Sequence, residues 1–214
     1  MAKRNRTLLF DFDGTIADTM HTILGIYNGI VAPSYNCKPL PPEKIEEMRN
    51  AHSRDVMHEY NVTIFKLPFM IMRARKELSR RIDAIEPKTG IVEAIKALKA
   101  KNCGLGILTQ NSRKNVHYFF KKHGLENAFD FVYTSLFAFN KHKVIRKILR
   151  KWNISPSELI YIGDETRDID AAKKAGIKVA AVTWGYNKPE ALAARNPDYL
   201  ITSTTQLLAL IQRR

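Results

Sequence analysis

The chain has 214 residues, of which 45% are hydrophobic and 26% are charged, and its formal net charge is +14 at pH 7. This length and composition exclude global disorder, and no apolar run approaches the roughly 18–20 residues that a membrane-spanning helix needs. The positive charge favours anionic partners, from phosphorylated metabolites to nucleic acid, and we expect no signal peptide because the first apolar run soon ends at an acid.

The first predicted strand ends in two acids. Residues 8–19 read Leu-Leu-Phe-Asp-Phe-Asp-Gly-Thr-Ile-Ala-Asp-Thr. Because strand side chains alternate between faces, Asp11 and Asp13 would point the same way, and their charges would repel unless a cation lay between them. Gly14 permits a sharp turn, and Thr15 can hydrogen-bond within it. This arrangement suits divalent-metal binding and nucleophilic attack by a carboxylate, although plain turns and calcium loops share the Asp-x-Asp-Gly pattern.

The next segment, residues 19–86, is predicted to be helical. Helical patterns occupy about 18–31, 41–60 and 66–85, with no convincing strand between them, and several prolines separate the first two. A helical insertion directly after the acidic strand end would lie over that end as a lid. Enzymes with parallel sheets bind ligands outside the carboxyl ends of their strands, so the lid would close over the chemistry.

Strands and helices alternate in the rest of the chain. Such alternation predicts right-handed βαβ units and an α/β fold, with a Rossmann-like parallel sheet core, helices on both faces and an inserted α-helical cap. The predicted strands are 104–109, 129–134, 159–163, 179–183 and an edge strand at 199–202, and the predicted helices are 90–101, 112–123, 143–153, 167–175 and 204–212.

Polar residues also follow the second strand. Thr109, Gln110, Asn111 and Ser112 stand between that strand and the next helix. Thr109 and the free N–H groups of the helix start can hold a phosphate. Asn111 or Ser112 can cap the same helix, and the two roles are compatible.

The strand at 159–163 ends in a further acid, Asp164, within the run Gly-Asp-Glu-Thr-Arg-Asp. Asp164 can complete a metal site begun by Asp11, and Glu165 and Asp168 can hold metal-bound waters. Acids that merely favour a helix N-terminus would show the same pattern.

The helix predicted at 143–153 carries much of the positive charge. Its apolar residues occupy one face and its basic residues the other, so a solvated helix face accounts for most of this charge. A lysine just before it can neutralise a phosphate and a nucleophile together.

The motifs in this order resemble those of the haloacid dehalogenase superfamily. The helical segment is similar to the type-1 cap of that superfamily, and the general layout is similar to phosphoglycolate phosphatases. The resemblance implies a catalytic core of residues 1–18 and 87–214 and a cap of residues 19–86. The matching residues are Asp-Phe-Asp-Gly-Thr at 11–15, Ile-Leu-Thr at 107–109, Lys141 and the acidic run at 163–168.

The resemblance implies a magnesium-dependent phosphomonoester hydrolase. Asp11 would attack phosphorus and form an aspartyl-phosphate. Asp13 would protonate the leaving oxygen and then deprotonate the hydrolytic water, and an acid at this position argues against dehalogenase chemistry. Mg²⁺ would contact the carboxylates of Asp11 and Asp164 and the backbone carbonyl of Asp13.

The residues that would bind the phosphoryl group depart from the family pattern in two places. Thr109 and the Gln110 amide would hold phosphoryl oxygens, with Lys141 opposite. Gln110 stands where many family phosphatases have Asn, although the backbone donor survives this change. His142 follows the lysine where Pro is usual, and Lys141 is preferred to Lys143 as the motif lysine.

The substrate is expected to be a small phosphorylated metabolite such as 2-phosphoglycolate, read by the cap. Candidate contacts lie in residues 50–54, where Arg54 can meet a substrate carboxylate. Ser53 can equally cap a helix while Arg54 lies in solvent. His52 is expected to be exposed rather than catalytic, because Asp13 already supplies the acid and base.

Other functions remain open from the sequence. A sugar phosphomutase would use the same core, and a nucleic-acid-binding or nucleic-acid-end-processing protein would use the basic charge. No zinc finger or RNA motif accompanies that charge, so nucleic acid is expected only on a non-specific basic surface. Cys37 and Cys103 lack the spacing of a zinc site, which favours reduced thiols in the cytoplasm. No membrane partner is expected.

Overall fold

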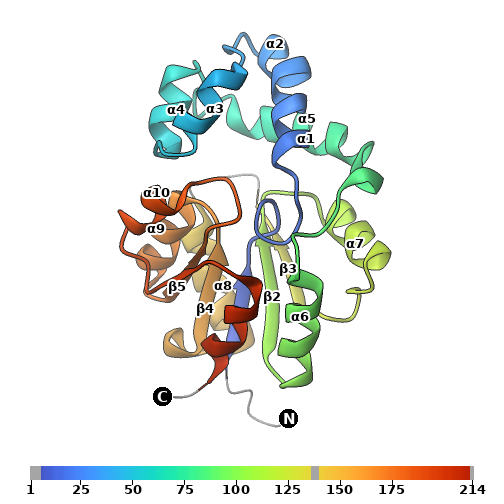
Figure 1. Ribbon diagram of the computed structural model, residues 1–214, viewed down its shortest axis with the longest axis vertical. Helices are drawn as coiled ribbons and strands as arrows, with labels where there is room; N and C mark the ends of the chain where they lie inside the picture. Colours follow the sequence, from blue (N-terminus) through green and yellow to red (C-terminus); the bar gives the residue numbers. More distant parts are fainter. Residues whose placement is uncertain (1–5, 136–139, 213–214) are drawn as a thin grey trace.

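The structure is a computed structural model that describes residues 6–135 and 140–212, without the side chains of Ser53 and Arg54. Within these ranges six strands form one parallel sheet in the order β3-β2-β1-β4-β5-β6 (Figure 1). The strands are β1 Thr7–Phe10, β2 Gly104–Thr109, β3 Phe131–Thr134, β4 Leu159–Gly163, β5 Lys178–Val182 and β6 Tyr199–Ile201.

Strand β1 lies at the centre of the sheet, between β2 and β4. The chain continues from β1 to β2 and β3 on one side and then crosses to β4 on the other side. Such a reversal of strand order separates the connections at the carboxyl ends of the strands and opens a ligand crevice there. The residues that follow β1 and β4 therefore lie where an α/β protein binds its ligand.

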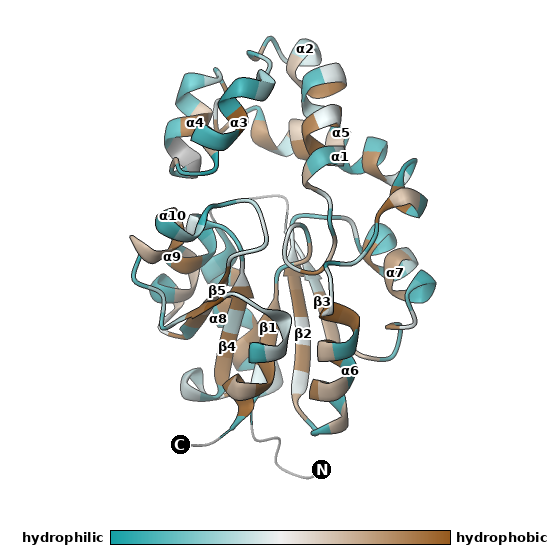
Figure 2. Ribbon diagram, viewed as in Figure 1, coloured by the Kyte–Doolittle hydropathy of each residue, from teal (hydrophilic) through white to brown (hydrophobic). Residues whose placement is uncertain are grey.

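Helices cover both faces of the sheet, as the sequence predicts. Leu8 and Phe10 of β1 point to one face and Leu9 to the other, because strand side chains alternate. The two helical layers bury the inner strands β2, β1, β4 and β5, which are hydrophobic almost throughout (Figure 2), whereas the edge strands β3 and β6 are partly exposed. The first face packs against α6 Ile91–Ala100, α7 Arg113–Lys122 and the closing helix η6 Thr204–Ile211, and the second packs against α8 Lys141–Trp152, α9 Thr166–Ala175 and α10 Pro189–Ala193.

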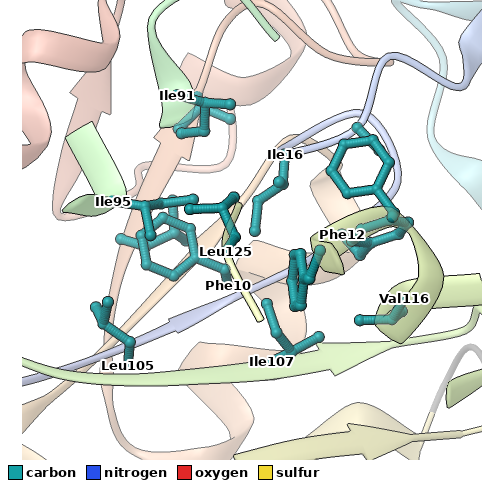
Figure 3. Packing of buried hydrophobic residues seen from close by; sticks show 14 of the residues in the cluster. Phe10, Phe12, Ile16, Ile91, Ile95, Leu105, Ile107, Val116 and Leu125 are labelled. Atoms are coloured by element: carbon teal, nitrogen blue, oxygen red, sulfur yellow. The ribbon is translucent and has the colours of Figure 1, made fainter. Parts of the chain in front are cut away.

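The larger core anchors the turn after β1. Phe10, Phe12 and Ile16 pack among side chains from α6, α7 and β2 (Figure 3). The rings of Phe12 and Phe119 meet edge to face, with centroids 5.1 Å apart. Because Phe12 is fully buried between the two acids of the motif, hydrophobic packing holds the backbone that carries both carboxylates.

The inserted segment forms a helical cap beyond the carboxyl ends of the strands (Figure 1). No strand occurs among the residues described between α1 and η3, as the sequence predicts. Likewise no helix in the described ranges is long and apolar enough to cross a membrane. The cap elements are α1 Met20–Ile26, the π-helix η1 Tyr27–Val31, α2 Ala32–Ser34, η2 Pro42–Lys44, α3 Ile45–Met48, α4 Ser53–Glu59, α5 Leu67–Ser79 and η3 Ile82–Ala84.

Two chain crossings join the cap to the core, and they lie side by side. The Asp18 N–H donates to the Glu86 carbonyl at 2.8 Å, and the Lys88 N–H donates to the Ile16 carbonyl at 2.8 Å. The Lys88 ammonium also pairs with the Asp18 carboxylate at 2.8 Å. We propose these crossings as the domain boundaries, with residues 1–18 and 87–214 as the core and 19–86 as the cap.

The prediction of a single helix at 41–60 is wrong. This segment is divided into α3 and α4, because the Arg49 carbonyl accepts the Lys188 N–H at 3.0 Å and the Asn187 side-chain N–H at 2.8 Å. In a continuous helix that carbonyl would bond the N–H four residues further along. A contact with the core therefore ends the helix at this point.

Other helix boundaries differ by smaller amounts. The pattern at 18–31 contains the π-helical turns of η1, and the pattern at 66–85 is divided into α5 and η3. Helix α8 begins at Lys141, two residues before its predicted start, and the closing helix at 204–212 is a 3₁₀ helix. The short helix α10 was not predicted.

Candidate active site

Three strands of the sheet end in the residues that the sequence singled out. Asp11 follows β1, Thr109 is the last residue of β2, and Asp164 follows β4. All three side chains are buried. Because β1, β2 and β4 are neighbours, their carboxyl ends bring these side chains to one place beneath the cap.

Lys141 lies between two carboxylates at the centre of this place. Its ammonium donates to Asp11 Oδ2 at 2.6 Å, to Asp168 Oδ1 at 2.7 Å and to the Tyr161 hydroxyl at 2.9 Å. The Lys141 side chain has no exposed surface, so all three donors of its ammonium are directed at buried oxygens. Lys143, the alternative in the sequence, is exposed and lines a separate surface cavity with Arg146.

The charges of this cluster depend on one another. Burial opposes the charged form of Lys141, but Asp11 and Asp168 outweigh it and raise the pKa of the lysine well above its usual value. Burial also raises the pKa of Asp11, although Lys141 lowers it, and the charge of Asp168 raises it further. An additional cation among these acids would favour their ionised forms.

Asp164 is held by groups from two distant segments. Its Oδ1 accepts the Thr15 hydroxyl at 2.6 Å and its Oδ2 accepts the Tyr186 N–H at 2.7 Å. Gly14 has φ +79°, and a Cβ there would lie 2.3 Å from Asp164 Oδ2, so only glycine allows this close approach. Burial and the neighbouring charges of Glu165 and Asp11 raise the pKa of Asp164 well above its usual value.

The carboxylates of Asp11, Asp164 and Asp168 form a group that fits a divalent cation. One oxygen from each residue lies within 4.8 Å of the others. Hard oxygen ligands of this kind suit Mg²⁺, and the raised pKa values of Asp11 and Asp164 indicate carboxylates that lack sufficient positive charge. Asp11 and Asp168 both bind Lys141, whereas Asp164 does not, so Asp164 is the carboxylate of the group that this lysine leaves uncompensated.

Asp13 stands apart from this group and faces the second strand end. Its Oδ1 accepts the side-chain N–H of Asn111 at 2.9 Å, and its Oδ2 accepts the Thr109 hydroxyl at 3.5 Å. Burial raises the pKa of Asp13 to about 6, while the hydrogen bond from Asn111 lowers it. A carboxyl group with such a pKa can both give and take a proton near neutral pH.

A pocket of about 250 Å³ lies between these acids and the cap. Arg75 of α5 reaches into it, donating through Nε to the Gln110 carbonyl and through Nη2 to the Ser135 carbonyl at 3.0 Å. Among the described residues, Arg75 Nη1 and Gln110 Nε2 have no hydrogen-bond partner in the protein. The pocket is lined by Asp11, Asp13, Ile23, Ile71, Ala74, Arg75, Leu78, Gln110, Asn111, Glu165, Arg167 and Tyr186.

The start of α9 supplies a further charged pair at the pocket wall. Arg167 pairs with Glu165, and burial opposes the charge of Arg167 but Glu165 and Asp168 raise its pKa above the usual value. Glu165 and Asp168 also form the capping box of α9. These acids therefore do lie at a helix N-terminus, as the alternative explanation from the sequence expects, and Asp168 contacts Lys141 as well.

The residues at 50–52, which belong to the predicted substrate contacts and whose side chains are described, do not line this pocket. These are Asn50, Ala51 and His52, and the predicted role of Arg54 falls outside the described side chains. The prediction that His52 is exposed is wrong, because its side chain is 17% exposed and lies 3.2 Å from Asp170. The cap side of the pocket comes from α1 and α5 instead.

Several pocket residues were missed from the sequence. Asn111 was interpreted only as a possible helix cap, but Ser112 caps α7 and Asn111 binds Asp13. Arg75 carries no local motif and Tyr186 was assigned no role, and only the packing of the cap and of the segment after β5 brings them to the pocket. An isolated arginine on an amphipathic cap helix gives no sequence signal that separates it from solvated arginines.

Known proteins resemble the chain along almost its whole length. A phosphoglycolate phosphatase of Synechococcus elongatus is 29% identical over 206 residues, which cover 96% of this chain and 97% of that protein. The pyrophosphatase PpaX of Listeria innocua is 27% identical, with 99% of both chains covered. The crystal structure of a predicted phosphatase from Clostridium acetobutylicum has the same fold, with a TM-score of 0.80 at 21% identity over 98% of this chain and 99% of that chain.

The sequence profile described as haloacid dehalogenase-like hydrolase matches residues 8–182. This range runs from β1, with the two acids that follow it, to the end of β5 and includes the cap. The protein therefore belongs to the haloacid dehalogenase-like hydrolase family.

Proposed function

We propose that this hydrolase is a magnesium-dependent phosphatase that forms an aspartyl-phosphate and acts on a small phosphorylated metabolite such as 2-phosphoglycolate. The observation that carries the proposal is the pair of carboxylates at the floor of the pocket. Asp11 is bound to Lys141, and Asp13, with its pKa near 6, lines the same pocket. One carboxylate is thus available as a nucleophile and the other as an acid and base.

The two acids divide the reaction into two steps. A carboxylate oxygen of Asp11 attacks phosphorus, while the bond to the leaving oxygen breaks and Asp13 donates a proton to that oxygen. Asp13 then takes a proton from a water that attacks the aspartyl-phosphate, and the bond between Asp11 and phosphorus breaks. Inorganic phosphate and free Asp11 result, so both residues return to their initial states.

Asp11 and Asp164, with the backbone carbonyl of Asp13, are the groups that would hold Mg²⁺. When bound, Mg²⁺ would offset the negative charge of the transferring phosphoryl group. Lys141 would add positive charge from the side of Asp11, and Thr109 and the Gln110 backbone amide would hold phosphoryl oxygens. The Gln110 side-chain Nε2, which has no hydrogen-bond partner among the described residues, is a further donor at this wall of the pocket.

The cap side of the pocket supports an organic leaving group. Ile23, Ile71, Ala74 and Leu78 give it an apolar wall, and Arg75 places one cation in it. A small carboxylate-bearing alcohol matches that combination, because Arg binds a carboxylate well and the apolar wall suits a carbon chain. The similarity to PpaX makes pyrophosphate the second candidate. The leaving group of pyrophosphate is itself a phosphate, and it carries more negative charge than Arg75, the single cation on the cap side of the pocket, would offset.

A substrate screen tests the proposal. Phosphate release would be measured with Mg²⁺ from 2-phosphoglycolate, sugar phosphates, nucleotides, pyrophosphate and 5′-phosphorylated oligonucleotides, without an activating bisphosphate. The proposal expects turnover of a small phosphomonoester and loss of turnover with a chelator. Transfer that needs a bisphosphate would favour a phosphomutase, and preference for an oligonucleotide end would favour nucleic-acid processing.

We place the reaction in the cytoplasm, which the free cysteines Cys37 and Cys103 support.

A further inference from the structure

A chain of hydrogen bonds connects the cap to Asp13. The Ser79 hydroxyl of α5 donates to Asn115 Oδ1 in α7. Asn115 Nδ2 donates to Asn111 Oδ1 at 2.9 Å, and Asn111 Nδ2 donates to Asp13 Oδ1 at 2.9 Å. The residues Asn111 and Asn115 are 3% and 1% exposed, so both amides are removed from water.

The carboxylate at the end of the chain sets the direction of every bond in it. Ionised Asp13 only accepts hydrogen bonds, so Asn111 must turn its N–H groups towards it. The Asn111 carbonyl then accepts from Asn115 and from the Ser112 N–H, at 2.8 Å for the latter. The Asn115 carbonyl is left to accept from the Ser79 hydroxyl. The amide orientations are therefore mutually consistent along the whole chain.

The fold of α7 does not require an amide at position 115. The Asn115 backbone N–H is already capped by the Ser112 hydroxyl at 3.1 Å. An apolar side chain of the same size would fill the buried position without the cost of burying an amide. We therefore attribute the amide at position 115 to the hydrogen bonds that it makes with Asn111 and with the cap helix α5.

Asn115 contacts the cap through a second group as well. Its Nδ2 lies 3.3 Å from the Arg75 carbonyl, while the Arg75 side chain binds the carbonyls of Gln110 and Ser135. Helix α5 is thus docked on the core by the same turn that faces the pocket. If α5 moved away, Asn115 would lose both of its cap partners and the end of the chain at Asp13 would be less restrained.

We propose that Asn115 is a positioning residue that orients Asp13, through Asn111, when α5 is docked on the core. The inference rests on the proposed role of Asp13 as the proton donor to the leaving oxygen. When the cap is docked and the pocket is closed, Asp13 is thereby held in the orientation in which it donates its proton. An undocked cap leaves Asp13 less well oriented, which slows reaction outside the closed pocket.

The test compares two leaving groups in single-turnover experiments. An alkyl phosphate needs a proton on its leaving oxygen, whereas p-nitrophenyl phosphate releases a stable anion without one. Asn115→Leu, which keeps the size of the side chain and removes its hydrogen bonds, should slow release of the alkyl alcohol by about tenfold or more. Release of p-nitrophenol should slow by less than about threefold, and the half-saturating substrate concentration should change little.

Ser112→Ala is the matched control in the same helix turn. It removes the cap of α7 but leaves the amide chain intact. This variant should lose thermal stability and keep the wild-type ratio of the two rates. Ser79→Ala removes the cap end of the chain, together with the contact of the Ser79 hydroxyl to the Arg75 carbonyl within α5. It should show the same leaving-group dependence as Asn115→Leu to a smaller extent, which provides a test if Asn115→Leu does not fold.

Equal slowing of both substrates by Asn115→Leu, or a wild-type ratio of rates in both chain variants, would overturn the inference. Asp13→Asn separates this failure from failure of the proposed function. If Asp13→Asn shows strong leaving-group dependence and the chain variants show none, only the role of Asn115 is wrong. If Asp13→Asn shows none either, the proposed role of Asp13 fails first.

Discussion

At the scale of single residues, we expect Asp11 to decide whether the chemistry occurs. Its carboxylate follows the central strand and binds Lys141 at 2.6 Å. We expect Asp11→Asn to lower turnover by more than about a thousandfold, because an amide cannot attack phosphorus. The measurement is phosphate release by the folded variant. Asp198→Asn is the control, since Asp198 lies directly before β6. It is therefore at the amino ends of the strands, whereas the pocket is at their carboxyl ends. Near wild-type turnover of Asp11→Asn would remove Asp11 from the role of nucleophile.

Asp164 is the residue on which the magnesium requirement should depend. It is fully buried and accepts hydrogen bonds from Thr15 and Tyr186, which an Asn side chain of the same shape can largely retain. Asp164→Asn should therefore raise the Mg²⁺ concentration needed for half-maximal activity more than it raises the apparent substrate constant. Titrations of activity with each component would measure this difference. Equal changes in both, or full activity of the wild type in chelator, would argue against the metal assignment.

At the scale of single elements, α5 is stabilised by one buried acid. Glu77 is 3% exposed at its side chain and is contacted by Arg73, Arg80 and Arg81. Burial raises the pKa of Glu77, but the hydrogen bonds and charge of Arg80 outweigh burial and lower the pKa below its usual value. Stability from this group is therefore present above the pKa of unfolded Glu and is lost as pH falls through the lower pKa of the folded state.

We accordingly expect Glu77→Gln to lower the melting temperature at pH 7 and to approach the wild type as the pH is lowered. Thermal unfolding at several pH values checks this. Glu47→Gln, at an exposed cap pair with Lys44, should change the melting temperature little at any pH. A constant difference between wild type and Glu77→Gln across the pH range would contradict the argument.

Apart from Lys141 at its start, helix α8 carries its positive charge on a face exposed to solvent. Lys147, Arg150 and Lys151 are exposed, whereas Ile145 and Ile148 are buried against the sheet. Reversing these three charges to Glu should weaken retention on a polyanion column. Turnover of a small substrate should change by less than about tenfold, or roughly 1.4 kcal/mol of barrier. A larger loss in a folded variant would connect the basic face to the reaction and move the function towards nucleic-acid processing.

At the scale of the whole molecule, the cap should move relative to the core. The two crossings at Asp18 and Glu86 lie side by side, so they can act as one hinge. The cap is held to the core on one side by Arg75 and on the other by Arg49, which binds the carbonyls of Gly185 and Tyr186. Polar contacts of this kind can break and form again, so a ligand can adjust the closure of the cap.

Small-angle X-ray scattering can measure this motion. We expect the radius of gyration to fall when Mg²⁺ and beryllium fluoride, an analogue of a phosphoryl group on a carboxylate, are added to the wild type. Asp11→Asn, which lacks the carboxylate that binds the analogue, should show no such change. Identical scattering of the wild type with and without the ligands would mean that the cap is fixed.

Much of the core was predictable from the sequence, because the information is local. Strands β2 and β4 begin and end at the predicted residues, since a strand buried on both faces must be a short apolar run between polar residues. Parallel strands place their carboxyl ends at one edge, so Asp11, Thr109 and Asp164 could be expected together. The apolar and basic faces of α8 follow in the same way from helical periodicity.

Contacts within the cap and around Asp13 were decided only by the tertiary structure. The pairing of Asn111 with Asp13 joins residues 98 positions apart, and that of Arg75 with Gln110 joins residues 35 apart. The interruption between α3 and α4 likewise depends on Lys188, whose N–H donates to the Arg49 carbonyl in place of a hydrogen bond within the helix. The order of apolar and polar residues is given directly by the sequence. This order was sufficient to predict the sheet and the acids at the ends of its strands. Which buried polar groups satisfy one another depends on the packing of segments that are remote in the chain, and that packing decided the pocket.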